Sequence, residues 1–181
     1  GRTIGFTYNA KGQVLTETDP LGKVTSYGYD AKGNKISETD ALGKVTLYAY
    51  NAAGNKTSET DVLGNVKTFS YDALGHLVGE TDVLGNVTTF TYDNLGRVTR
   101  AVKTRTTSSG PVEVAVTSSY DAAGNVISSS DRNGATTLFE YDGLGHKTAE
   151  ILSDGSRTEY SYNPRGDLIE TSYPDGTSEQ T

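Results

Sequence analysis

The chain has 181 residues, enough for one domain or for a short array of repeated elements. Apolar residues make up 34% of the chain and Cys, Met and Trp are absent, which excludes a large aliphatic core, disulfides and thiolate metal sites. A formal net charge of −7 argues against a nucleic-acid-binding protein, and no apolar run approaches the roughly 18 residues of a membrane-spanning helix.

A Tyr-Asx-x-x-Gly element recurs every 21 residues. It begins at Tyr8, Tyr29, Tyr50, Tyr71 and Tyr92, and it resumes with the same spacing at Tyr120, Tyr141 and Tyr162. One insertion of seven residues, within residues 101–117 and around Ser108-Ser109-Gly110-Pro111, separates the two series. We therefore predict a single array of repeats over residues 1–181. Because the chain lacks an initiating Met and starts in mid-pattern, we expect it to belong to a longer protein.

Each repeat contains two turns and two strands. In chain order, residues 19–22 (Asp-Pro-Leu-Gly) predict a turn, residues 23–29 a strand, residues 30–33 (Asp-Ala-Lys-Gly) a second turn and residues 34–39 a second strand. Asp or Asn at the first position and Gly at the fourth are typical of the type I turn of a G1-bulge hairpin. The segments between turns are rich in Thr, Val, Tyr and Phe, so we predict an all-β ribbon of about 16 antiparallel strands.

Glycine is expected at the fourth turn position because a side chain would be strained at positive φ. The predicted turn glycines are Gly12, Gly22, Gly33, Gly43, Gly54, Gly64, Gly75, Gly85, Gly96, Gly124, Gly134, Gly145 and Gly166. In two late repeats, Ser153-Asp154-Gly155 and Pro174-Asp175-Gly176 replace the usual Asp-x-Leu-Gly. We expect these hairpins to persist with a different loop.

Aromatic residues form two columns on one face of the predicted sheet. Alternate residues of a strand point to the same face, so Thr25, Tyr27 and Tyr29 share one face, opposite to Val24 and Ser26. The repeat aromatics are Tyr8, Tyr27, Tyr29, Tyr48, Tyr50, Phe69, Tyr71, Phe90, Tyr92, Tyr120, Phe139, Tyr141, Tyr160 and Tyr162. We interpret them as cross-strand packing that stabilises a sheet without an aliphatic core, with an aromatic platform for a ligand as the alternative.

The charged residues do not form a recognisable metal site. Glutamates at the 21-residue period would lie about 9.6 Å apart, a distance at which like charges in water repel weakly, so we interpret them as a solvated face. These are Glu17, Glu38, Glu59 and Glu80. The turn aspartates lack the clustered spacing of a calcium loop, and we expect them to cap their own turns.

Nothing in the sequence indicates catalysis. His76 and His146 each follow a turn glycine, at a position that we interpret as exposed and tolerant of many residues. No Ser, Cys or His grouping is typical of nucleophilic catalysis. We therefore expect no enzymatic activity, no catalytic residue, no cofactor and no metal site.

The stretch from Tyr71-Asp72-Ala73-Leu74-Gly75 to Tyr92-Asp93 closely resembles the YD repeat of the RHS (rearrangement hotspot) family. That family includes bacterial RHS polymorphic toxins, the cage-forming components of Tc insecticidal toxins and animal teneurins. The resemblance implies that the β-ribbon curls as part of a spiral, hollow shell, which in bacteria encloses a C-terminal toxin. The conserved RHS core that plugs the shell and cleaves off the toxin is not recognisable here, so no catalytic aspartates are carried over.

The resemblance thus implies a structural segment of a toxin-enclosing shell, without chemistry of its own, in a secreted or cell-surface protein that a secretion system delivers. Expected partners are further YD repeats of the parent chain and the enclosed toxin polypeptide. Two alternatives stay open. A carbohydrate-binding or adhesive repeat would bind a glycan through the aromatic face. A self-assembling fibre subunit would pair with other copies of itself through unpaired strand edges.

Overall fold

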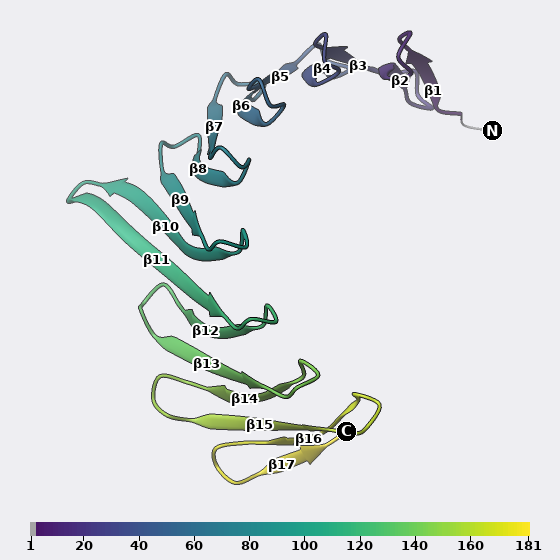
Figure 1. The fold of residues 1–181 in the computed structure, drawn as a ribbon. Helices are drawn as coiled ribbons and strands as arrows, with labels where there is room; N and C mark the ends of the chain where they lie inside the picture. The colour runs from purple at the N-terminus through teal and green to yellow at the C-terminus, as the bar shows by residue number, and fades with distance from the viewer. Residues whose placement is uncertain (1–2) are drawn as a thin grey trace. The chain divides into compact units, whose positions relative to one another are not determined.

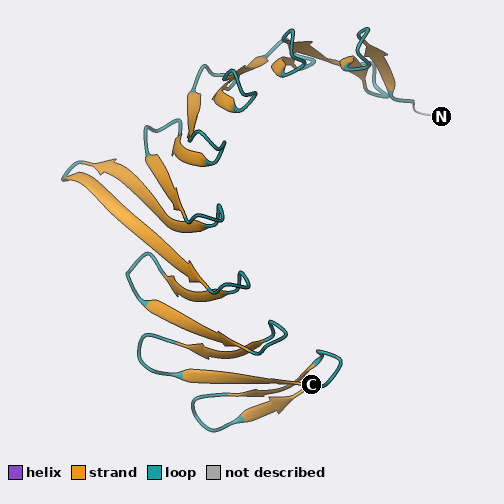
Figure 2. Ribbon diagram, viewed as in Figure 1, coloured by secondary structure: helices purple, strands orange, loops and turns teal. Residues whose placement is uncertain are grey.

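The computed structural model describes residues 3–181, and over this range it contains strands and turns but no helix (Figures 1 and 2). Seventeen strands form one open antiparallel sheet of hairpin repeats, one strand more than predicted. The all-β hairpin-repeat fold expected from the sequence is confirmed. Residues 1 and 2, where the predicted array begins, lie outside the described residues. No segment between residues 3 and 181 is a helix long and apolar enough to cross a membrane.

The chain divides into two compact units, Gly1–Val87 and Thr88–Thr181. The strands of the first unit are β1 (Gly5–Tyr8), β2 (Val14–Thr18), β3 (Val24–Tyr29), β4 (Lys35–Thr39), β5 (Val45–Tyr50), β6 (Lys56–Thr60), β7 (Val66–Tyr71) and β8 (Leu77–Thr81). From β9 (Val87–Tyr92) onward, the strands are β10 (Val98–Thr107), β11 (Gly110–Tyr120), β12 (Val126–Ser130), β13 (Thr136–Tyr141), β14 (Lys147–Ile151), β15 (Arg157–Tyr162), β16 (Leu168–Ser172) and β17 (Ser178–Gln180).

Consecutive strands pair within each compact unit, and a bulge marks every second hairpin. In the β3–β4 hairpin, Gly28 lies opposite Ser37, but the next residue, Tyr29, lies opposite Lys35. The same register shift occurs before Tyr50 and Tyr71. A bulge of this kind increases the local twist of the strand that carries it. The repeat tyrosine therefore sits at the bulge of its hairpin, directly before the turn.

The sheet is a single layer with very little buried side-chain volume. In β5, Thr46, Tyr48 and Tyr50 are half-buried on one face, while Val45 and Leu47 are exposed on the other. Among the described residues, the buried apolar side chains are those of Val102 and Ala149. The contacts that hold the sheet together must therefore lie mainly along its half-buried face and at its turns.

The seven-residue insertion lengthens one hairpin. Strands β10 and β11 pair from Arg100 and Thr117 to Thr107 and Gly110, and a two-residue loop joins them. Strand β12 pairs with β11 only from Ser118 onward. We call residues 101–116 the hairpin arm, which extends beyond the neighbouring β12–β13 turn (Figure 1).

The expectation of a different loop in the two late repeats is wrong. In residues 152–155, the Gly155 N–H donates to the Leu152 carbonyl at 3.0 Å and the Leu152 N–H donates to the Ser156 carbonyl at 2.9 Å. Residues 173–176 repeat this pattern, as do all the Asx-x-x-Gly turns. The backbone hydrogen bonds and the glycine thus suffice for the turn, and the carboxylate at its first position is dispensable.

Candidate functional site: turns, tyrosines and a lysine–aromatic ladder

The turns are held by their own backbone and by an Asx side chain. At residues 61–64, Asp61 Oδ1 accepts hydrogen bonds from the Leu63 and Asn65 N–H groups at 2.8 and 2.9 Å. The Gly64 N–H donates to the Asp61 carbonyl at 3.0 Å, and Gly64 has a φ of 83°. This is the capping role expected of the turn aspartates.

All thirteen predicted turn glycines have φ between 77° and 100°, the left-handed region. Three further glycines, which the sequence-based set omits, also have positive φ: Gly110, Gly155 and Gly176. The first closes the hairpin arm and the other two close the divergent turns. The Asp-Gly pairs at residues 154–155 and 175–176 were the sequence signal for the latter two.

The two edges of the ribbon differ. We call the turns that follow the repeat tyrosine the tyrosine-side turns (for example 30–33 and 142–145) and the others the far-side turns (for example 40–43 and 131–134). A methyl group added at Gly33 would lie 3.2 Å from Gln13 Nε2 of the preceding repeat, and one at Gly166 would lie 2.9 Å from His146 Nε2. At Gly43 and Gly134, as at the other far-side glycines, no atom lies within 4 Å. Successive turns therefore touch along one edge and stand apart along the other.

The residue after a tyrosine-side glycine can link two repeats, and the interpretation of His76 and His146 as exposed is wrong, because both are half-buried. His146 Nδ1 lies 2.8 Å from Asp142 Oδ2 of its own turn, and its ring stacks on Tyr162 of the next repeat with centroids 4.9 Å apart. His76 Nδ1 lies 2.9 Å from Asp72 Oδ2. Both imidazoles are about 30% exposed. The side chain is half-buried because neighbouring turns stack on it.

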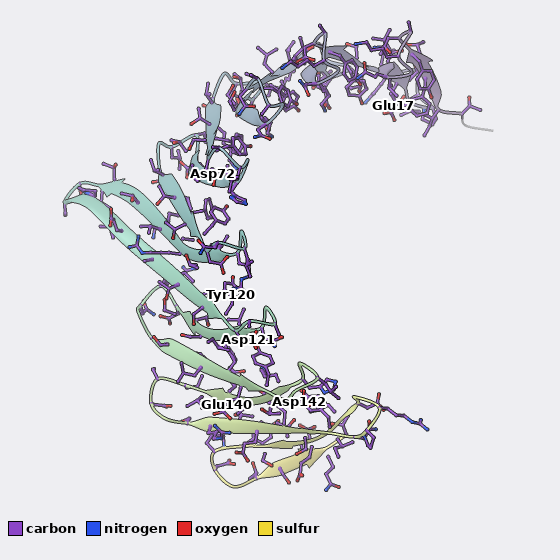
Figure 3. The ribbon with its side chains drawn as sticks, in the orientation of Figure 1. Glu17, Asp72, Tyr120, Asp121, Glu140 and Asp142 are labelled. Atoms are coloured by element: carbon purple, nitrogen blue, oxygen red, sulfur yellow. The ribbon has the colours of Figure 1, made fainter. Side chains whose placement is uncertain are left out.

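Arg97 occupies the same position and makes the same link with a longer side chain. Its Nε donates to Asp93 Oδ2 at 2.7 Å, and its NH1 donates to the Asp121 carbonyl at 3.0 Å. The guanidinium carbon lies 4.6 Å from the centroid of the Tyr120 ring. Tyr120 and Asp121 lie at the same edge of the ribbon as Asp142 of the following turn (Figure 3).

The repeat tyrosine is a clamp between repeats. Tyr50 Oη, at the end of β5, donates a hydrogen bond to the carbonyl of Lys35 at the start of the neighbouring strand β4, at 2.9 Å. The bond recurs at 2.8–2.9 Å from the hydroxyls of Tyr29, Tyr71, Tyr120, Tyr141 and Tyr162 to the carbonyls of Val14, Lys56, Val98, Val126 and Lys147. Each hydroxyl therefore ties its own repeat to the preceding one.

The sequence contained a signal for this clamp. The position before the turn is Tyr in all eight repeats, whereas the position two residues earlier is Tyr, Phe or, at residue 118, Ser. Ring packing alone tolerates Phe, so a column restricted to Tyr indicates that the hydroxyl has a partner.

The second aromatic column alternates with lysines. Lys35 Nζ lies 5.5 Å from the Tyr27 ring centroid and 5.0 Å from that of Tyr48. Lys56 Nζ lies between Tyr48 and Phe69, at 5.6 and 5.0 Å. In the second compact unit, the ammonium of Lys147 lies between two further rings of the column. We call this arrangement the lysine–aromatic ladder.

Two of the periodic glutamates, Glu38 and Glu59, pair with lysines of this ladder, which the interpretation of the glutamates as a solvated face did not include. The Lys35 and Lys56 ammonium groups lie 2.7 and 2.6 Å from Glu38 and Glu59, three residues further along the strand. These four side chains are 34–38% exposed. The Lys35 pKa is raised, first because its ammonium donates to Glu38 and further by charge interactions with Tyr48, Glu38 and Tyr27, while burial opposes the shift. Glu38 and Glu59 thus each balance the charge of a lysine that lies between two rings.

The opposite face carries one ion cluster. Arg157 binds Glu140 through two N–H···O bonds of 2.9 and 2.8 Å and donates to Glu159 at 2.8 Å. These bonds raise the Arg157 pKa and lower that of Glu140. Ala149 lies opposite both glutamates in the register, beneath the cluster, and is fully buried.

The contacts of these residues lie within the ribbon itself. Over residues 3–181, no three His, Cys, Asp or Glu side chains group in a way that could hold a metal ion. The hydroxyls, carboxylates, imidazoles and ammonium groups described above bind other parts of the same ribbon. The turns, the tyrosine clamps and the ladder can join repeats to one another. In the lysine–aromatic ladder, lysine ammonium groups lie over the faces of the rings.

The RHS Repeat family model matches residues 8–41, 36–66, 71–108 and 120–157, more than half of the chain. No curated protein sequence matches. The crystal structure of TcdB2-TccC3 without its hypervariable C-terminal region is similar, with a TM-score of 0.60 and 17% identity over 94% of this chain and 11% of that one. The crystal structure of TcdB2-TccC3-TEV is similar over the same shares, with a TM-score of 0.53 and 16% identity.

A Tc holotoxin pore from Photorhabdus luminescens, with a mutation in TccC3, has a TM-score of 0.50 and 16% identity over 98% of this chain and 13% of that one. At such identities the likeness concerns the fold alone. This chain spans only 11–13% of the length of the chains it matches. The family match covers the repeats whose turns, clamps and ladder are described above, and the chain belongs to the RHS repeat family.

Proposed function

We propose that this chain is a wall segment of an RHS-type shell that encloses a C-terminal toxin or effector polypeptide. The observation that carries the proposal is the difference between the two edges. Within each compact unit, turns in contact along one edge and separated along the other make the ribbon fan out, and a fanned ribbon is what a curved wall requires. The similarity to TcdB2-TccC3 structures, which are far longer than this chain, supports a place within a larger ribbon.

In this proposal the functional residues are structural ones. The turn glycines set the reversals, and the repeat aromatics and their lysines join one repeat to the next over a single array of residues 1–181. The partners are further repeats of the parent chain and the enclosed polypeptide, in a secreted or cell-surface protein. The segment performs no chemistry. A glycan platform is not favoured, because lysines lie over the rings of the ladder.

Cysteine labelling in the intact parent protein tests the proposal. The natural chain has no cysteine, so Thr46→Cys and Leu47→Cys each introduce one thiol, on opposite faces of β5. If the ribbon is a wall, a bulky polyethylene-glycol maleimide will modify only one of the two cysteines in the native parent protein. After unfolding, it will modify both. Modification of both at similar rates in the native parent would contradict a wall with an enclosed side.

A further inference from the structure

The hairpin arm has an unpaired strand edge. A two-residue hairpin loop closes on a hydrogen-bonded pair, here Thr107 and Gly110, and hydrogen-bonded pairs then alternate along the two strands. Val112 and Val114 therefore bond to β10, whereas Glu113 and Ala115 direct their N–H and C=O groups away from it. Thr117, four residues after Glu113, confirms this alternation of inward and outward residues. Its N–H points away from β10 and donates to Ser130 Oγ at 2.9 Å.

No strand covers this edge among the described residues. Strand β12 pairs with β11 only from Ser118 onward, so residues 110–116 of β11 have β10 as their one strand partner in the described pairing. Pro111, which has no N–H to donate, stands at an outward position, as is typical of edge strands. The arm thus presents an edge that can accept a further strand.

A basic pocket lies beside the arm, all of it within the second compact unit. It has a volume of about 320 Å³, and its lining residues are Thr88, Ala101, Lys103, Arg105, Val114, Val116 and Arg132. Three of these side chains are cationic and none is acidic, although the whole chain carries a net charge of −7. Ala101, Val114 and Val116 supply an apolar floor. Arg132 comes from the β12–β13 turn, next to the outer edge of β11.

We propose that the arm binds an extended, acidic polypeptide segment as an additional strand on the outer edge of β11. Side chains two positions apart on an added strand point to the same face, so an apolar residue of the segment enters the pocket, and acidic residues two positions before and after it meet Arg105 and Arg132. The partner is acidic because the pocket is the cationic part of an acidic ribbon. This docking site does not depend on whether the ribbon encloses a shell.

Fluorescence anisotropy of a fluorescein-labelled peptide in which Asp and Leu take turns at every second position, with Thr between them so that both point to one face, tests the charge requirement when it is titrated with the full 181-residue chain. Replacing both arginines (Arg105→Glu with Arg132→Glu) should weaken binding by about tenfold, the loss expected for two exposed ion pairs. Arg165→Glu, in a turn distant in sequence from the arm, is the matched control and should leave binding unchanged. A peptide with Lys in place of Asp should not bind.

A proline tests the strand edge separately. Glu113→Pro removes an outward N–H without removing a β10–β11 hydrogen bond, so the chain should keep its circular dichroism and lose peptide binding, while Glu113→Gln keeps it. Ala115→Pro makes the same change at the next outward residue if Glu113→Pro fails to fold. Unchanged binding by a folded proline variant would overturn strand addition. If inorganic phosphate at low concentration displaces the peptide as completely as the proline change does, the pocket is a simple anion site. That result would also overturn strand addition.

Discussion

In six repeats, the hydroxyl of the tyrosine before the turn donates a hydrogen bond to the preceding repeat. The backbone carbonyl that accepts it belongs to the residue opposite the bulge, for example Lys35 for Tyr50. The ring fills half-buried space on a single-layer sheet, and the hydroxyl adds a directed bond to the neighbouring strand. The position before the turn is always Tyr because its hydroxyl makes this bond. The position two residues earlier, which needs only a ring for packing, is Tyr or Phe in all repeats but one.

We predict that Tyr50→Phe lowers the free energy of unfolding by about 1 kcal/mol, the usual net value of one hydrogen bond. Tyr48→Phe is the matched control, since Phe occupies that position in other repeats and the change should be close to neutral. Urea unfolding followed by circular dichroism measures both. Equal effects of the two changes would show that ring packing, not the hydroxyl, is what matters.

The turn glycine is constrained by its backbone conformation even where space is free. Gly43 has a φ of 78° and no atom within 4 Å of an added methyl group. Gly43→Ala should therefore cost about 1–2 kcal/mol from strain alone. Gly143→Ala should be within about 0.5 kcal/mol of neutral, because that glycine is outside the positive-φ set and also has free space around it. Thermal unfolding compares them, and a neutral Gly43→Ala would contradict the assigned turn.

At the scale of the element, the turn carboxylates couple the hairpins to pH. The pKa of Asp30 is lowered, first because the Asn34 side-chain amide donates to it and then because the Asn34 N–H does. Asp61 and Asp121 have lowered pKa values too, led by the side-chain amides of Asn65 and Asn125. A pKa lower in the folded state gives stability that is present above the unfolded value, near 4, and is lost as the pH falls through the folded value.

We therefore predict that the chain loses stability below about pH 4 and that replacing these three aspartates by asparagine flattens this decline. Asparagine keeps the Oδ1 acceptor and cannot be protonated in this range, and it already begins three turns, at Asn9, Asn51 and Asn163. Chemical unfolding between pH 3 and 7 is the measurement. An identical acid decline in the triple variant would show that other groups control it.

The hairpins could be predicted from sequence because their information is local. A turn needs its Asx and Gly within four residues, and strand faces follow from alternation. The contacts between repeats could not be predicted in the same way. That His146 reaches Tyr162, or that Lys35 lies between two rings, depends on how twist brings neighbouring repeats together. The prediction of a different loop in the late turns was wrong because the turn does not need an Asx side chain at its first position. At Leu152 the backbone hydrogen bonds form the same turn without one.

At the scale of the whole molecule, each repeat binds mainly its neighbours, so stability is expected to be a sum over repeats and their interfaces. Removing residues 35–55, one 21-residue period, joins Asn34 to Lys56 and restores the sequence pattern at the junction. We predict that this shortened chain keeps its β-sheet circular dichroism and elutes as a folded species.

Removing residues 35–44 is the contrasting change. It deletes one strand and one turn, so every later tyrosine-side turn moves to the other edge of the ribbon and the clamps across the junction are lost. This variant should unfold at markedly lower denaturant concentration or aggregate. Similar stability of the two deletions would show that repeat register does not govern the fold.

Electron microscopy of the intact parent protein, together with its native mass, tests the central claim most directly. The account predicts a large hollow particle in whose wall these repeats, with their fanned edges and tyrosine clamps, can be traced. A filament, or a free species of about the mass of this chain alone (19.2 kDa), would contradict the wall segment.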